Sequence, residues 1–232
     1  MSDFNGEDAA QRCNIEADFE RLRKIMEDPS FRTGSGLGGE QAFYIYDYPP
    51  ECELEVRESI PGLIKRLQTM SPKHDGDYAP TVLWLDLYDL VIEILETRKV
   101  LQKIIDFEQD RHDPVSGNKV EDKFLALLEN MVGADSRYLP DAVGSRFREA
   151  REEGKADIVF LTGVGQTYPY VRAHTLLETL QGQVEDKPLV LFYPGRFTTT
   201  SVSGSTMSLY GCLPASNYYR ARSLRDMMRD ER

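Results

Sequence analysis

Apolar residues recur at helical spacing over several stretches of the chain. The first predicted helix covers residues 14–28 and ends before Pro29. Its apolar face is formed by Ile15, Phe19, Leu22 and Met26. Further helices are predicted at 53–70, at 87–107, at 121–132, at 140–153 and after Pro169. We expect Pro61-Gly62 to kink or split the second of these, because proline removes a helical hydrogen bond.

Short runs of β-branched, aromatic and aliphatic residues separate these helices and predict strands. Four such runs lie at 42–48, 81–86, 157–161 and 189–193, and a fifth is expected near 207–210. Each of the first four is followed by a turn or by a helical pattern. The alternation predicts an α/β fold with a mostly parallel sheet flanked by helices, Rossmann-like or a degenerate P-loop-like form.

The domain organisation follows from the spacing of these elements. We interpret residues 1–232 as a single α/β domain, because the length suits one domain with a decorated edge. Residues 108–155, between the second and third strands, are expected to form a helical insertion. Residues 212–232 are expected to form a C-terminal helical tail.

Composition narrows the class of protein. Hydrophobic residues make up 41% and charged residues 29%, which is ordinary for a globular domain. The net charge of −11 argues against a dedicated nucleic-acid binder, although arginines gather after Arg220. No apolar run is long enough to cross a membrane, and the polar start of the chain is unlike a secretory signal.

Cysteine usage bears on the compartment. The three cysteines, Cys13, Cys52 and Cys212, are far apart and odd in number. We therefore expect neither a disulfide framework nor a metal knuckle. This usage suits a reducing cytoplasm, which is the predicted location.

The strongest candidate site is the glycine turn that follows the third strand. In an open α/β sheet ligands gather at the carboxyl ends of strands, and a glycine turn before a helix can present N–H groups to a phosphate. The turn lacks the third glycine of a dinucleotide fingerprint and the lysine of a P-loop, so tight packing competes with anion binding as its explanation. The residues of this possible ligand or anion turn are Thr162, Gly163, Gly165, Thr167, Arg172 and His174.

Other chemistry is weakly represented. Asp47 and Asp86 end predicted strands and would suit Mg²⁺ if those strands were neighbours, but edge hydrogen bonding explains them as well. No nucleophile elbow accompanies the serines near position 203. We therefore assign no catalytic residues, no metal and no cofactor, and we predict that the chain is not an enzyme.

Tyrosine is enriched at protein interfaces, and this chain carries tyrosines in clusters. Packing at the edge of the core, with each hydroxyl paired, is the competing explanation. The possible partner interface comprises Tyr44, Tyr46, Tyr48, Tyr168, Tyr170, Tyr218 and Tyr219.

Several blocks taken together resemble the BrxB family of BREX bacteriophage-exclusion systems. They are Gly36-Leu37-Gly38-Gly39-Glu40, Phe43-Tyr44-Ile45-Tyr46-Asp47-Tyr48, Glu53-Leu54-Glu55-Val56-Arg57, the stretch from Phe160 to His174, Pro188-Leu189-Val190-Leu191-Phe192-Tyr193-Pro194-Gly195, and Asn217-Tyr218-Tyr219-Arg220-Ala221. The Leu-Thr-Gly-Val-Gly block with its Tyr-Pro is the most specific of them.

The resemblance implies a role in antiviral defence as an assembly or adaptor subunit without catalytic residues. It implies PglZ as the first partner and the ATPase BrxC and the methyltransferase PglX as further ones. Two alternatives stay open: a degenerate nucleotide- or phosphate-binding regulatory domain, and a DNA contact through the arginine-rich C-terminus.

Overall fold

The computed structural model describes residues 14–33, 42–109, 123–133, 136–200, 204–211, 213, 216–217 and 221–230. Its helices are α1 (Ile15–Glu27), α2 (Pro29–Thr33), η2 (Pro50–Cys52), α3 (Glu53–Gln68), α4 (Leu87–Thr97), α5 (Leu101–Gln109), α6 (Lys123–Val132), α7 (Tyr138–Glu152), α8 (Val164–Thr167), α9 (Ala173–Leu180) and α10 (Leu224–Asp230). Its strands are β1 (Phe43–Tyr48), β2 (Val82–Asp86), β3 (Ile158–Thr162), β4 (Leu189–Thr200), β5 (Gly204–Leu209), β6 (Ser216–Asn217) and β7 (Arg222–Ser223).

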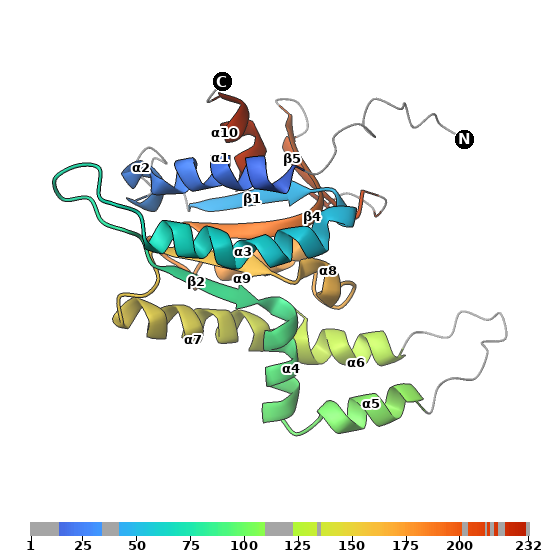
Figure 1. Cartoon of the computed structure of the whole chain (residues 1–232). Coiled ribbons are helices and arrows are strands. Elements are labelled where there is room, and N and C mark those ends of the chain that lie inside the picture. Colours follow the sequence, from blue (N-terminus) through green and yellow to red (C-terminus); the bar gives the residue numbers. More distant parts are fainter. Residues whose placement is uncertain are drawn as a thin grey trace, which may run out of the picture.

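The strands form one twisted sheet with helices on both faces, which confirms the predicted α/β class (Figure 1). The order is β2-β3-β4-β1-β7, and these neighbours pair in parallel. The long β4 continues past this sheet and pairs antiparallel with β5, which pairs with β6. In the usual dinucleotide-binding order the first two strands are neighbours, whereas here β3 and β4 separate β1 from β2.

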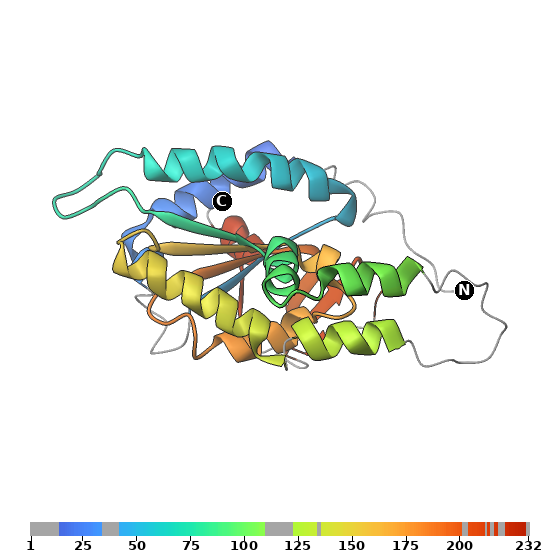
Figure 2. The ribbon, with the colours of Figure 1, turned by 90° about the horizontal axis from the view of Figure 1, so that it is seen from below.

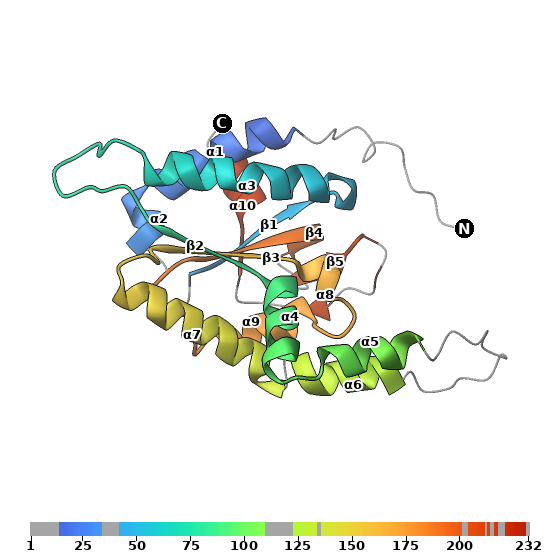
Figure 3. The same cartoon turned by 60° about the horizontal axis from the view of Figure 1, so that its bottom comes forward.

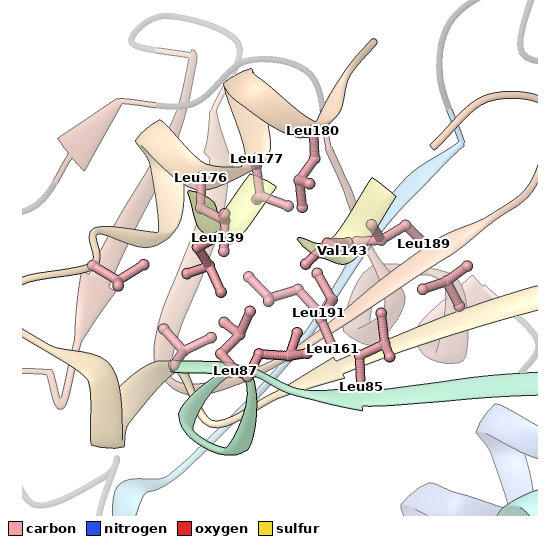
Figure 4. Packing of buried hydrophobic residues seen from close by; sticks show 14 of the residues in the cluster. Leu85, Leu87, Leu139, Val143, Leu161, Leu176, Leu177, Leu180, Leu189 and Leu191 are labelled. Atoms are coloured by element: carbon pink, nitrogen blue, oxygen red, sulfur yellow. The ribbon is translucent and has the colours of Figure 1, made fainter. Parts of the chain in front are cut away.

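Each face of the sheet has its own hydrophobic core. One lies under α1, α3 and α10 and includes Phe19, Tyr46, Phe160 and Phe192. The other lies under α4, α7 and α9, and Figure 4 shows its leucines and valine converging from strands and helices. Because both faces are covered, the inner strands are buried along their whole length, as in most parallel sheets.

Three local predictions need correction. α3 runs unbroken through Pro61, which is exposed, because buried residues on both sides of it (Val56, Ile60, Leu63 and Leu67) hold the helix on the core. The long helix expected at 87–107 is two helices, because Lys99 takes a left-handed φ of 58° between them. The expected helical tail contains the short strands β6 and β7 before α10.

The described residues between β2 and β3 include four helices. α4 and α7 cover the sheet, while α5 and α6 project beside it as a pair (Figure 2). The single-domain interpretation of residues 1–232 stays a prediction.

Cys52 is buried at the start of α3 and is disulfide-bonded, contrary to the expectation from cysteine spacing, and its partner lies outside the described residues. Among the described residues, no helix combines the length and apolar character that a bilayer crossing requires.

Candidate functional site

Polar side chains meet where β2 and β3 end, at the carboxyl edge of the sheet. The Asp86 carboxylate, 6% exposed, is the centre of this group. Its Oδ1 accepts the backbone N–H groups of Tyr88 (3.0 Å) and Asp89 (3.2 Å) and so caps α4. Its Oδ2 accepts the Thr162 hydroxyl at 2.8 Å. Asp86 therefore joins β2, α4 and β3.

Further side chains extend this network across the edge. The Trp84 indole N–H donates to the Thr162 hydroxyl at 3.0 Å. Arg57 of α3 lies 3.4 Å from Asp86 Oδ2 and donates to the Gln166 side chain at 2.9 Å. Trp84, Arg57 and Gln166 were not predicted as part of the site, since the sequence gives no signal for which strands and helices are neighbours.

Side chains from elsewhere in the chain fill the space beside the predicted glycine turn. Gly163 has a φ of +82°, and a Cβ built there would lie 2.7 Å from Asp86 Oδ1. A Cβ on Gly165 would lie 2.4 Å from the Tyr210 hydroxyl. The Thr167 hydroxyl, fully buried, donates back to the turn's own carbonyls. Both glycines are thus explained by close neighbours within the chain.

The two remaining candidates of this turn lie at the start of α9. Arg172 is exposed and sits at the N-cap without a capping side chain. His174 is half-buried, and burial lowers the pKa of its imidazole, which the nearby Glu178 only partly offsets. A neutral imidazole beside an exposed arginine is a weak basis for an anion site.

A second pair of acidic groups, the buried Asp47 and the partly buried Glu53, lies near the end of β1. Burial raises the pKa of Glu53, which accepts the Tyr48 hydroxyl at 2.5 Å. Burial also raises the pKa of Asp47, which accepts the Phe197 backbone N–H at 3.1 Å.

Because two strands separate β1 from β2, Asp47 and Asp86 are not at neighbouring strand ends as a shared Mg²⁺ would require. No three His, Cys, Asp or Glu side chains in the described part of the chain gather closely enough to hold a metal ion.

The predicted tyrosine interface divides into three groups. Tyr44, Tyr46 and Tyr48 are at most 4% exposed within the core, so they are not available to a partner in the folded chain. Tyr168 is 36% exposed, and Tyr170 is half-buried with its hydroxyl 3.4 Å from the Gln166 carbonyl. Tyr218 and Tyr219 lie outside the described residues.

Exposed apolar side chains that the sequence did not single out lie near the same edge. Tyr88 (38% exposed) opens α4, and its backbone N–H would lie 3.0 Å from a Cβ on Gly163. Tyr210 (39%) covers Gly165. Together with Tyr168 they form what we call the carboxyl-edge patch: Tyr88, Tyr168 and Tyr210. Exposed aromatic side chains of this kind mark protein-binding surfaces.

Two arginines in the described part of the C-terminal segment, Arg225 and Arg229, are engaged within the chain. Arg225 donates to the Asp47 carbonyl, pairs with Asp18 at 3.2 Å and lies over the Tyr46 ring. Arg229 pairs with Asp226 at 3.3 Å. The contacts of Arg225 fix α10 against α1 and β1, so this side chain is not free to contact DNA phosphates.

Comparison with known proteins supplies the family. The family model described as "BREX protein BrxB" matches residues 83–224. A protein of Bacillus cereus (strain H3081.97) named BREX protein BrxB is 39% identical over 210 residues, which cover 89% of this chain and 97% of that protein. The chain belongs to the BrxB family. A second BrxB, from Escherichia coli O9:H4 (strain HS), is 28% identical over 207 residues, or 89% of this chain and 90% of that protein. No solved structure matches the chain significantly.

For this BrxB protein the packing of the glycine turn leads to a prediction about nucleotides. We expect ATP, GTP and NAD at millimolar concentration to leave the melting temperature unchanged, because a ligand that binds only the native state would raise it by mass action. Differential scanning fluorimetry measures this directly. A concentration-dependent rise with any of them, lost in an Arg172→Ala variant, would restore the nucleotide-binding alternative.

Proposed function

We propose that the chain is a non-catalytic assembly or adaptor subunit of a cytoplasmic BREX anti-phage system, and that it binds PglZ. Membership of the BrxB family makes it a BREX component, and BREX systems exclude bacteriophage. BrxC and PglX are further candidate partners. The proposal goes beyond family membership in naming the partner and the adaptor role.

The observation that carries the proposal is the carboxyl-edge patch. At the place where an α/β enzyme holds its substrate, the polar groups of Asp86, Thr162 and Trp84 bond to one another. Three tyrosines, Tyr88, Tyr168 and Tyr210, reach solvent there beside the polar pair of Arg57 and Gln166. A closed polar network beside exposed tyrosines suits contact with a protein better than chemistry on a small molecule.

The patch can be tested with a double variant, Tyr88→Ala with Tyr168→Ala. Tyrosines at the centre of an interface contribute about 2 kcal/mol or more, so we expect PglZ binding to weaken by about thirtyfold or more. Biolayer interferometry with immobilised PglZ gives the dissociation constant. Both side chains are partly exposed, so the melting temperature of the double variant should match that of the wild type.

Tyr138→Ala is the matched control for this test. Tyr138 is the first residue of α7 and is 40% exposed. The guanidinium of Arg98, at the far end of α4 from Tyr88, lies over its ring. Its replacement should leave PglZ affinity unchanged. Equal affinities for the double variant and the wild type would remove the patch as the PglZ surface.

A further inference from the structure

β2 forms an outer margin of the sheet and, within the part of the chain that the structure describes, pairs only with β3. Figures 1 and 3 show it running between α3 on one face and α7 on the other. Its sequence, Val82-Leu83-Trp84-Leu85-Asp86, has no proline and no charge before its last residue. Natural edge strands are usually protected by charges, prolines or bulges against pairing with another chain. β2 lacks these protections.

The backbone of β2 presents a defined set of free groups at this margin. The Thr81 carbonyl accepts the N–H groups of Asp157 and Ile158, both at 3.1 Å, so it faces β3. Backbone groups alternate in direction along a strand, so those of Val82, Trp84 and Asp86 face away from β3. The Val82 N–H accordingly donates to the Gln68 side chain at 3.2 Å.

Four outward groups then remain without a hydrogen-bond partner among the described residues: the Val82 C=O, the Trp84 N–H and C=O, and the Asp86 N–H. They are two donors and two acceptors, placed symmetrically about Trp84. An antiparallel copy of the same strand, related by a twofold axis at Trp84, satisfies all four. The Trp84 groups pair with each other, and each Asp86 N–H meets the Val82 C=O of the other copy.

α3 carries a second feature with the same symmetry. Gln68 is bonded to Val82 and Arg57 to Asp86, so the middle of α3 lies level with Trp84. Pro61 lies four residues after Arg57, on the same face of the helix, and is exposed. Leu54 and Ile64, seven residues before Pro61 and three after it, continue an apolar stripe beside the margin. A twofold axis at Trp84 would bring this stripe against its own copy.

We propose that β2 is a self-association surface, through which a second copy of this chain pairs antiparallel with the first. The two sheets become one continuous sheet, and the α3 helices pack against each other across the twofold axis near Pro61. An unrelated strand would leave its own groups unpaired opposite the Val82 N–H, which Gln68 occupies, and the Asp86 C=O, which α4 occupies. In the self-pair these engaged groups face each other, so this register and the adjoining apolar stripe favour a second copy. This inference does not depend on PglZ, because it concerns the purified chain alone.

The test uses size-exclusion chromatography with light scattering on the wild type, Pro61→Lys and Pro61→Ala. We expect the wild type at twice the 26.5 kDa chain mass, falling to the single mass on dilution. Pro61→Lys places two like charges beside the twofold axis and should weaken association at least about tenfold. Both variants remove a proline from a helix interior, so neither should unfold the chain. Pro61→Ala, which adds no charge, should remain a dimer.

Amide hydrogen exchange at Trp84 provides the second readout. Its N–H should exchange slowly in the dimer and quickly in Pro61→Lys, while the Leu85 N–H, which faces β3, stays protected in both. Wild type at the single mass throughout the accessible concentrations would overturn the proposal. So would a Pro61→Lys dimer with the Trp84 N–H still protected. The proposal would also fail if the chain were a monomer and its Trp84 N–H became protected only when another protein was added. β2 would then be a binding surface for that protein.

Discussion

Asp86→Ala is expected to lower the free energy of unfolding by about 3 kcal/mol. Loss of an N-cap costs about 0.5–2 kcal/mol, and the capped N–H groups of α4 lose their acceptor. The Thr162 hydroxyl, in a residue only 5% exposed, loses its acceptor as well, and an unsatisfied buried donor costs about 1–3 kcal/mol. Arg57 loses a partly exposed ion pair, which adds little.

Urea denaturation measures this effect, and Asp89→Ala is the matched control. Asp89 is an exposed aspartate in the first turn of the same helix, so its replacement should change the free energy of unfolding by well under 1 kcal/mol. A loss below 1 kcal/mol for Asp86→Ala would mean that the carboxyl-edge network is not a structural unit. The explanation of the Gly163 packing would then fail as well.

Phe160→Ala should destabilise the protein by about 3–5 kcal/mol, the range for phenylalanine truncation in a core. Phe160 is fully buried on β3, and its ring meets that of Phe192 on β4 edge-to-face at 5.1 Å. The change leaves a cavity between the sheet and the helices α1 and α3. Denaturant unfolding followed by circular dichroism gives the value.

Phe160→Leu is the comparison for that experiment. It keeps most of the volume and should cost well under half as much as the alanine change. Equal losses for the two variants would indicate that the ring contacts, and not the filled volume, dominate. A small loss for both would contradict the two-core arrangement.

The elements of the fold were predictable because their patterns are local. The four main strands and most helices follow from periodicity and from turn residues that lie within a few positions of one another. The order of the strands depends on contacts such as β1 with β4, between residues nearly 150 positions apart, and no local pattern encodes these. The breaks at Lys99 and the continuity through Pro61 are tertiary effects that override helix propensity.

The tyrosines of β1 show where the interpretation of a pattern was wrong. Phe43-Tyr44-Ile45-Tyr46-Asp47-Tyr48 was interpreted in part as an interface, yet it is a central strand covered on both faces. A six-residue run with little polar alternation is itself typical of a buried parallel strand. The hydroxyls of Tyr46 and Tyr48 are satisfied by Asp18 and Glu53, on elements whose placement a single sequence does not specify.

The glycine turn was placed correctly at the end of a strand, but its neighbours were not predicted. Asp86 and Tyr210 lie 77 and 45 residues from the glycines that they contact, Gly163 and Gly165. A sequence reading cannot separate a turn that cradles a phosphate from one that is filled by the chain's own side chains. That difference supports the predicted assembly role over the alternative of nucleotide or phosphate binding.

The central claim, an adaptor that binds PglZ, is tested most directly by mixing the purified chain with purified PglZ and measuring the mass by size-exclusion chromatography with light scattering. The account predicts a single stoichiometric complex that survives the column and is lost with the Tyr88→Ala and Tyr168→Ala double variant. Separate elution of the two proteins at their own masses, with both folded, would contradict it.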